Sequence, residues 1–311
     1  MNTGMDWENA VAGKSVMITG ASRGIGEAAA RHFAAQGANV LLAARSGDAV
    51  TRIAAEIEQE GGGRAAAIAL DVSRYQDVEN AVRRAVDMFG SLDVLVSNAG
   101  LIEPIALLAE SDPEGWCHTA DVNYKGVYFG LRAAIPVMLE QGGGSIVNVS
   151  SGAATGVLEG WSHYCSSKAA ALSLTRCAHL EYGAKGIRVL GLSPGTVATN
   201  MQKEIRASGI NRVSTLDWSA HIPPEWVARA MAFLATDPAS DKWLGQDFQL
   251  KSEEGHPLNG LCKVSNASRA VQVGKASLSA MLASDLQGCL VPAVVVLKSS
   301  LVSRRDGPKR H

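Results

Sequence analysis

The sequence predicts an α/β fold, a doubly wound parallel sheet of about seven strands with helices on both faces, so that the domain has three layers, α/β/α. Short apolar runs alternate with longer amphipathic segments along most of the 311 residues, which is the pattern of alternating strands and helices. The short runs are rich in Val, Ile and Leu and contain too few polar residues to face water. Strands of this kind are buried on both faces, and strand–helix–strand order at this spacing makes neighbouring strands parallel.

The elements can be assigned in chain order. The expected strands are residues 15–19, 39–44, 65–72, 92–98, 144–150, 187–193 and 244–250. The expected helices are residues 25–36, 49–60, 75–89, 114–140, 162–182 and 224–234. The last helix begins at Pro224, and proline is favoured at the first helical position.

A single domain accounts for most of the chain, because no repeat or low-complexity linker interrupts residues 13–250. We place this domain at residues 1–260. Residues 261–311 are predicted to form a poorly ordered C-terminal extension, since they are rich in Ser, Arg and Lys around one apolar run, LVPAVVVL. That run is much shorter than the roughly 20 residues that a membrane-spanning helix needs.

Composition excludes several classes of function. With 47% hydrophobic and 19% charged residues the chain is typical of a globular protein, and a net charge of -1 without a basic stripe argues against nucleic acid as a partner. The N-terminal segment has an acid and no long apolar run, so we expect neither a signal peptide nor a membrane partner, and a cytoplasmic location. The odd number of cysteines, without metal-type spacing, predicts free thiols and no metal site. They are Cys117, Cys165, Cys177, Cys262 and Cys289.

A glycine-rich turn joins the first strand to the first helix, in the run TGASRGIG. Glycines allow a sharp turn and let a pyrophosphate approach the N–H groups at the start of the helix, where the helix dipole favours an anion. The placement between strand and helix makes a dinucleotide more plausible than a plain tight turn. The residues expected to contact it are Gly20, Ser22, Arg23, Gly24, Ile25 and Gly26.

The end of the second strand indicates which dinucleotide binds. Dinucleotide folds usually carry an acid there, which accepts hydrogen bonds from the ribose 2′-hydroxyl, but this strand ends in Ala44 and is followed by Arg45. Arg23 stands inside the glycine turn. Two guanidinium groups flanking this position suit a 2′-phosphate, so we expect NADP(H) in preference to NAD(H).

Taken in order, these motifs resemble the short-chain dehydrogenase/reductase family, in its single-domain branch with a TGxxxGxG turn and a YxxxK pair. The resemblance covers about residues 12–250 and implies a Rossmann-like NAD(P)-binding domain. Besides the glycine turn it depends on motifs that are weak alone and strong together. These are Asp71-Val72, Ser97-Asn98-Ala99-Gly100, Asn123, Ser151, Tyr164 with Lys168, and Pro194-Gly195.

The resemblance implies a catalytic tetrad of Asn123, Ser151, Tyr164 and Lys168. Reduction of a ketone needs a hydride from the nicotinamide and a proton for the oxygen, and a tyrosine hydroxyl can donate that proton. An ammonium group nearby favours the phenolate and so lowers the tyrosine pKa, which is a possible role for Lys168. Of two adjacent serines, the family spacing selects Ser151 to bind the substrate oxygen and leaves Ser150 as a packing residue. By resemblance, Asn123 would hold a water that connects Lys168 to solvent.

The resemblance also implies further cofactor contacts. These are Asp71 and Val72 at the adenine, Asn98, Ala99 and Gly100 beside the fourth strand, Lys168 at the nicotinamide ribose, and Pro194, Gly195, Val197 and Thr199 at the carboxamide and phosphates, with Tyr164 as a further cofactor contact. Ser97 is a departure, because the family commonly has Asn there. A second departure is Lys251-Ser252-Glu253, where the family usually ends its last strand with Asp-Gly-Gly. This puts a tetramer in doubt, although a homodimer or homotetramer is still expected.

The substrate is chosen by loops, which here bring apolar residues. They are Ile102, Ala153, Leu158, Trp161 and Met201. We expect an NADP(H)-dependent oxidoreductase that interconverts a small-molecule ketone and a secondary alcohol. The run 199–206 is similar to the lid of carbonyl reductases of the benzil and sepiapterin reductase kind.

Two alternatives stay open. One is a 3-oxoacyl-[acyl-carrier-protein] reductase, which would use cations such as Lys125, Arg132 and Lys185 to bind an acidic carrier. The other is an NADPH-binding sensor or scaffold without turnover, although such a protein has no need of the tetrad.

Overall fold

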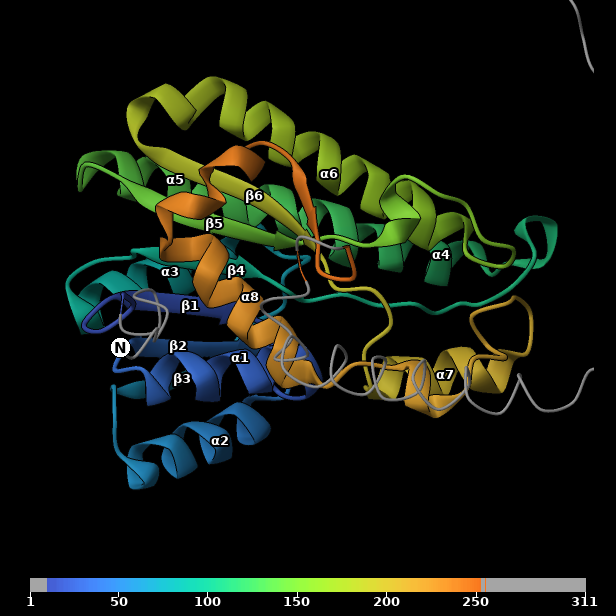
Figure 1. The fold of residues 1–311 in the computed structure, drawn as a ribbon, viewed down its shortest axis with the longest axis horizontal. Helices are drawn as coiled ribbons and strands as arrows, with labels where there is room; N and C mark the ends of the chain where they lie inside the picture. The colour runs from blue at the N-terminus through green and yellow to red at the C-terminus, as the bar shows by residue number, and fades with distance from the viewer. Residues whose placement is uncertain (1–9, 253–254, 256–311) are drawn as a thin grey trace, which may run out of the picture. The chain divides into compact units, whose positions relative to one another are not determined.

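The computed structural model describes residues 10–252 and Gly255. Its centre is a parallel sheet of seven strands in the order β3-β2-β1-β4-β5-β6-β7, which confirms the predicted fold class (Figure 1). The strands are β1 (Ser15–Thr19), β2 (Asn39–Ala44), β3 (Ala65–Ala69), β4 (Val94–Ser97), β5 (Gly144–Val149), β6 (Ile187–Ser193) and β7 (Asp247–Gln249).

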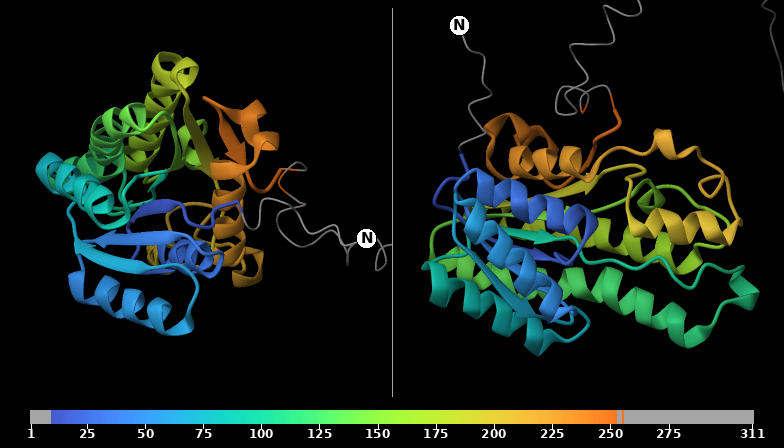
Figure 2. Two further views of the ribbon diagram at one scale, coloured as in Figure 1. Left: turned by 90° about the vertical axis from the view of Figure 1, so that its left-hand side faces the viewer. Right: turned by 90° about the horizontal axis from the view of Figure 1, so that it is seen from below.

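Helices cover both faces of the sheet, as Figure 2 shows in its left view. One face carries α1 (Gly24–Ala35), α2 (Gly47–Glu60) and α8 (Pro224–Thr236), and the other carries α3 (Tyr75–Phe89), α5 (Gly126–Glu140) and α6 (Ser162–Tyr182). The strands are buried on both sides and alternate between two apolar layers. On β1, for example, Val16 and Ile18 belong to the α1 layer and Met17 to the α3 layer.

Several predicted bounds were wrong. The helix expected over residues 114–140 is divided into α4 (Pro113–Ala120), a π-helical turn η3 (Asp121–Lys125) and α5. The helical pattern of the sequence continues from α4 through η3 into α5, because a π turn adds one residue to a turn without interrupting the helix. The helix α7 (Asn200–Ser208) was not predicted, since only one face of this short helix is buried. The expected strands at residues 65–72 and 244–250 are shorter in the structure, as β3 and β7.

Short 3-10 turns complete the described part of the chain. They are η2 (Leu108–Glu110), η4 (Gly152–Ala154), η5 (Gly183–Lys185), η6 (Trp218–Ala220) and η7 (Pro238–Trp243). The predicted extension at residues 261–311, with Cys262 and Cys289, lies outside the described residues. Of the other cysteines, which are all free thiols, Cys117 and Cys177 are exposed and Cys165 is buried.

The strand order reverses between β1 and β4, and this is the feature that creates a site. On one side of that point the chain proceeds from β1 to β3, and on the other from β4 to β7. Loops leave in opposite directions there and open a crevice at the carboxyl ends of the strands. The helices α4 and α7 lie at this end of the sheet, on the right in Figure 1.

Candidate active site

Two glycines of the turn after β1 pack so closely against backbone that no side chain fits at their positions. Gly20 has a φ of +66°, and a Cβ there would lie 2.8 Å from the Cα of Ala99. A Cβ on Gly26 would lie 2.3 Å from the Gly20 carbonyl oxygen. These positions require glycine, because real Cβ atoms do not approach backbone so closely.

Asn98 holds this turn against the end of β4. Its Nδ2 donates to the carbonyl oxygens of Thr19 (2.9 Å) and Gly20 (3.2 Å), and its own backbone N–H donates to Thr19 Oγ1 (3.0 Å). Sequence reasoning assigned Asn98 to the cofactor and did not single out Thr19. The structure shows that Asn98 and Thr19 join the ends of the two central strands.

The start of α1 has the properties of an anion site. Arg23 occupies the N-cap position, and no side chain caps the first N–H groups of the helix. A Cβ on Gly24 would lie 3.2 Å from Cγ2 of Thr199, so the glycine turn and the loop after β6 face each other. These N–H groups are a suitable cradle for a pyrophosphate, and the residues present therefore fit a dinucleotide cofactor.

The end of β2 carries positive charge and no acid. Arg45 and Arg23 are both exposed. Arg45 acts electrostatically on Asp71, at the end of the neighbouring strand. Burial raises the pKa of Asp71, hydrogen bonds from Ser73 and the charge of Arg45 lower it, and the net direction is down. Asp71 is therefore an ionised acid one strand away from the position that the predicted 2′-phosphate would occupy.

The structure gathers the predicted tetrad at the carboxyl edge of the sheet. Tyr164 and Lys168 lie one turn apart on α6, and the lysine Nζ is 5.8 Å from the centre of the tyrosine ring. Both are buried, at 8% and 3% exposure. Ser151 is the second residue after β5. A Cβ on Gly100 would lie 3.4 Å from Asn123 Oδ1 and 3.8 Å from Lys168 Nζ, so the tetrad is continuous with the loop after β4.

Asn123 lies in the π-helical turn and is fully buried. Its Oδ1 accepts from the Leu101 N–H and its Nδ2 donates to the Leu101 carbonyl oxygen, both at 2.8 Å. Its Nδ2 also lies 3.4 Å from Ser167 Oγ on α6. Asn123 therefore fixes the loop after β4 next to α6, a contact that the sequence did not reveal. π turns recur at functional sites, where they redirect a side chain.

Burial dominates the protonation of the tyrosine and lysine. It raises the pKa of Tyr164, while hydrogen bonding by the neighbouring Ser151 lowers it. Burial also lowers the pKa of Lys168 to about 8. The charge of the Asp247 carboxylate has the opposite, smaller effect and raises that pKa. The expected lowering of the tyrosine pKa by Lys168 is not among the influences on Tyr164 here. The Lys168 ammonium donates to the Val149 carbonyl oxygen at 2.7 Å.

The five apolar residues predicted for the substrate pocket lie in one cluster with Tyr164. Ile102, Ala153 and Trp161 are its buried members, and Leu158 and Met201 pack against them. The Trp161 ring meets the Tyr164 ring edge-on, at 5.6 Å between centres. His163 is the next buried neighbour, and its Nε2 lies 2.6 Å from the Ile102 carbonyl oxygen. The cluster thus surrounds the phenol with apolar groups.

A cavity of about 580 Å³ borders this cluster. Ala153 and Leu158 line it, together with Cys165 and Ala169 of α6. The α6 residues that line it, Ser162, Cys165, Ser166 and Ala169, follow one another at helical spacing and share a face of the helix. Its walls do not include Asn123, Ser151, Tyr164 or Lys168.

Comparison with known proteins assigns the family. The sequence pattern of the short chain dehydrogenase family matches residues 14–209. The chain belongs to the short-chain dehydrogenase/reductase family. It is 39% identical over 231 residues to meso-2,3-butanediol dehydrogenase of Serratia marcescens, covering 73% of this chain and 89% of that protein. It is 34% identical to a 3-oxoacyl-[acyl-carrier-protein] reductase of a Synechocystis strain, covering 78% of this chain and 96% of that reductase.

A solved structure agrees with this assignment. A protein described as a short-chain alcohol dehydrogenase from Sinorhizobium meliloti 1021 superposes with a TM-score of 0.69 at 29% identity, over 78% of this chain and 96% of that one. As a member of the short-chain dehydrogenase/reductase family, the chain is an oxidoreductase that acts on alcohol or carbonyl groups with a nicotinamide cofactor, NAD(H) or NADP(H).

Two further observations concern residues 10–252. No group of three or more side chains there could hold a metal ion. No helix of this part is long and apolar enough to cross a bilayer.

One residue of this short-chain dehydrogenase/reductase site was missed at the sequence level. Asp247 stands at the start of β7, and its charge raises the pKa of Lys168. A lone acid in the apolar run LGQDFQL was the available signal, because acids are depleted from buried strands unless something pairs with them.

Proposed function

We propose that the protein is an NADPH-dependent carbonyl reductase, which converts a ketone to a secondary alcohol and runs the reverse reaction as an alcohol dehydrogenase. The observation that carries this proposal is the buried pair Tyr164 and Lys168, which adjoins Ser151 at the carboxyl edge of the sheet. A hydroxyl in such a place can exchange a proton with a substrate oxygen.

The four residues have separate tasks in this proposal. NADPH supplies the hydride when it is bound. Tyr164 donates a proton to the carbonyl oxygen and takes it back in the reverse reaction. Ser151 donates a hydrogen bond to the same oxygen and stabilises the negative charge that develops there. The Lys168 ammonium favours the phenolate of Tyr164, and Asn123 holds a water that connects the lysine to solvent.

The cofactor is held by the glycine turn and by the loops after β3, β4 and β6. Gly20, Gly24 and Gly26 leave the N-terminal N–H groups of α1 open to the pyrophosphate. Arg23 and Arg45, both exposed, bind the 2′-phosphate of NADPH. The remaining predicted contacts stay proposals. They are Ser22, Ile25, Asp71, Val72, Asn98, Ala99, Gly100, Pro194, Gly195, Val197 and Thr199.

The substrate is proposed to be a small, uncharged aliphatic or aromatic ketone. Ile102, Trp161 and Met201 surround Tyr164 with apolar surface, which disfavours a charged sugar. Relatives in this family include meso-2,3-butanediol dehydrogenase and a cyclohexanol dehydrogenase of an Acinetobacter strain, and both are named for small neutral alcohols.

An acyl-carrier-protein substrate has weaker support. Lys185 belongs to η5 before β6, so it lies at the opposite end of the sheet from Tyr164. Lys125 is paired with Asp121 at 2.6 Å, which offsets its charge. Of the three cations considered, only Arg132 is left for an acidic carrier, although one relative is a reductase of this kind.

Oxidation of NADPH with a panel of ketones, diketones and 3-oxoacyl thioesters tests the proposal. We expect steady turnover with small neutral ketones, and slower or no turnover with 3-oxoacyl thioesters on the carrier protein. NADPH binding without turnover of any compound would favour a non-catalytic sensor. A homodimer or homotetramer in the cytoplasm is proposed with this function.

A further inference from the structure

A row of three residues on neighbouring strands brings two polar side chains into the apolar core beneath α6. The row consists of Asn148 on β5, Gly191 on β6 and Asp247 on β7, which are register partners across the three strands. Asn148 Nδ2 donates to Thr175 Oγ1 of α6 at 3.0 Å, so the row lies on the α6 face of the sheet. Tyr164 and Lys168 are on the same helix.

The sheet is built to accommodate the Asp247 carboxylate. A Cβ on Gly191 would lie 2.9 Å from Asp247 Oδ1, so any other residue at position 191 would collide with it. Oδ2 accepts a hydrogen bond from Ser193 Oγ at 2.7 Å. Oδ1 is closed off from solvent and has no hydrogen-bond partner among the described residues. A carboxylate oxygen in that condition is costly, and a nearby positive charge is the usual compensation.

Two cations of α6 lower the pKa of the Asp247 carboxyl group. Lys168 is buried, while Arg176 is exposed and therefore more strongly screened by solvent. Lys168 Nζ donates to the carbonyl oxygen of Val149. The next residue, Ser150, lowers the pKa of the Asp247 carboxyl group, although the two do not form a hydrogen bond of good geometry.

The remaining titratable neighbours are Tyr164, on the other side of the lysine, and His179, which lies against Gly245 just before β7. The ion pairs of the described residues include neither Lys168 nor Asp247. The two groups are therefore not in direct contact, and the influence of each charge on the other acts through space beneath α6.

We propose that Asp247 is a positioning residue of this active site, whose half-buried carboxylate is the counter-charge that keeps the Lys168 ammonium charged beside Tyr164. This inference rests on the function proposed above. The electrostatic directions agree with it. Burial lowers the pKa of Lys168 to about 8 and Asp247 raises it, while burial raises the pKa of Asp247 and Lys168 is among the groups that lower it.

The pH dependence of turnover tests the proposal. Lys168 with a pKa of about 8 loses its charge as the pH rises through that value, so carbonyl reduction by the unchanged protein should decline on the alkaline side. In Asp247→Asn the lysine loses a favourable charge and deprotonates earlier. The midpoint of the alkaline decline should move down by roughly half to one pH unit, so that the ratio of variant to unchanged kcat falls as pH rises.

Two control variants separate this role from a structural one. Asp241→Asn removes a carboxylate of η7 that pairs with Arg188 at the surface, and it should leave the alkaline midpoint in place. Ser193→Ala removes the hydrogen bond to Asp247 but keeps the charge, and it should also keep the midpoint. If Asp247→Asn lowers kcat by the same factor at every pH, the carboxylate has only a structural role and the proposal is wrong.

An unfolding measurement tests the same coupling without activity. Lys168→Met leaves the Asp247 carboxylate uncompensated, so it should destabilise the protein more than the double variant Lys168→Met/Asp247→Asn does. Strictly additive effects in urea unfolding would overturn the proposal. If no ketone is turned over, the proposed function fails while this cycle still decides whether Asp247 and Lys168 are coupled.

Discussion

Arg45 is the residue on which the cofactor preference depends. It stands exposed directly after β2, where an acid would otherwise accept hydrogen bonds from a ribose 2′-hydroxyl. A guanidinium binds phosphate through two parallel charge-assisted hydrogen bonds, so its charge distinguishes the two cofactors. Arg23 is exposed in the same region and leaves part of the preference in place when Arg45 is lost.

Replacement of Arg45 by Asp should therefore shift the preference toward NADH. We expect the ratio of kcat/KM for NADPH to that for NADH to fall by at least about tenfold, which corresponds to about 1.4 kcal/mol. Arg52→Asp is a suitable control, because Arg52 is also exposed but faces Glu56 on α2. A ratio that stays unchanged in Arg45→Asp would show that the 2′-phosphate binds elsewhere.

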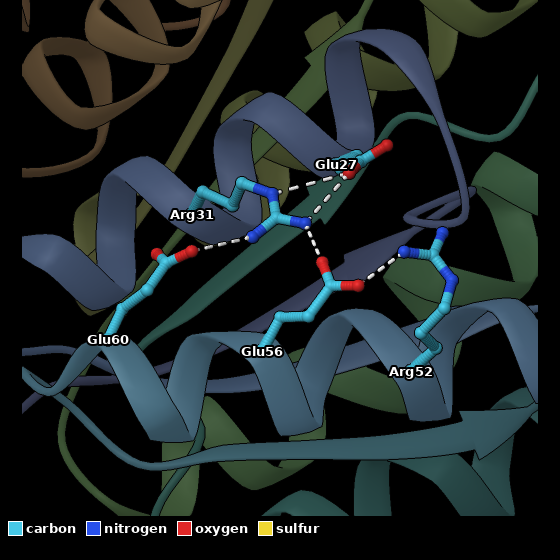
Figure 3. Close-up of polar contacts among 5 residues, drawn as sticks. All are labelled: Glu27, Arg31, Arg52, Glu56 and Glu60. Atoms are coloured by element: carbon cyan, nitrogen blue, oxygen red, sulfur yellow. Dashed lines mark hydrogen bonds and ion pairs between the residues drawn. The ribbon is translucent and has the colours of Figure 1, made fainter.

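The helices α1 and α2 are connected by a group of charges. Arg31 of α1 contacts Glu27 on its own helix and Glu56 and Glu60 on α2, and Arg52 contacts Glu56 (Figure 3). Individual surface ion pairs contribute little, but one arginine shared by three carboxylates also keeps those carboxylates from repelling one another. Since α1 begins at the glycine turn, this group helps to hold the helix whose N-terminus faces the proposed cofactor.

Arg31→Ala should lower the free energy of unfolding by about 1 kcal/mol, because three carboxylates lose their common partner. Arg52→Ala should cost less than about 0.5 kcal/mol, since Arg52 has one partner and is more exposed. Urea unfolding of both variants at low and high salt measures the difference. Equal losses for the two, or a loss for Arg31→Ala that salt does not reduce, would mean that the charge network has no special role.

At the scale of the whole molecule, the sheet could be predicted because its strands are local patterns. Short runs such as 15–19 and 187–193 are mostly apolar, and glycines mark where the chain turns. A parallel sheet buries such strands on both faces, so their sequence is informative without any tertiary knowledge. The division of the 114–140 segment could not be predicted, because a π turn leaves the apolar pattern intact.

The site was predictable only where a short motif fixes the geometry. Tyr164 and Lys168 are four residues apart on one helix, so their proximity follows from helical spacing. The bonds from Asn123 to Leu101 and the influence of Asp247 on Lys168 join distant parts of the sequence, and nothing local announces them. The lining of the cavity beside Ala153 also depends on which way α6 faces, which only the folded chain decides.

The central claim is that Tyr164 transfers the proton during carbonyl reduction, and Tyr164→Phe tests it most directly. The variant keeps the ring that packs against Trp161 and loses only the hydroxyl. NADPH binding, followed by nucleotide fluorescence, should stay within about threefold of the unchanged protein, while kcat with the best ketone should fall by at least about 10²-fold. Turnover that survives in Tyr164→Phe would contradict the account.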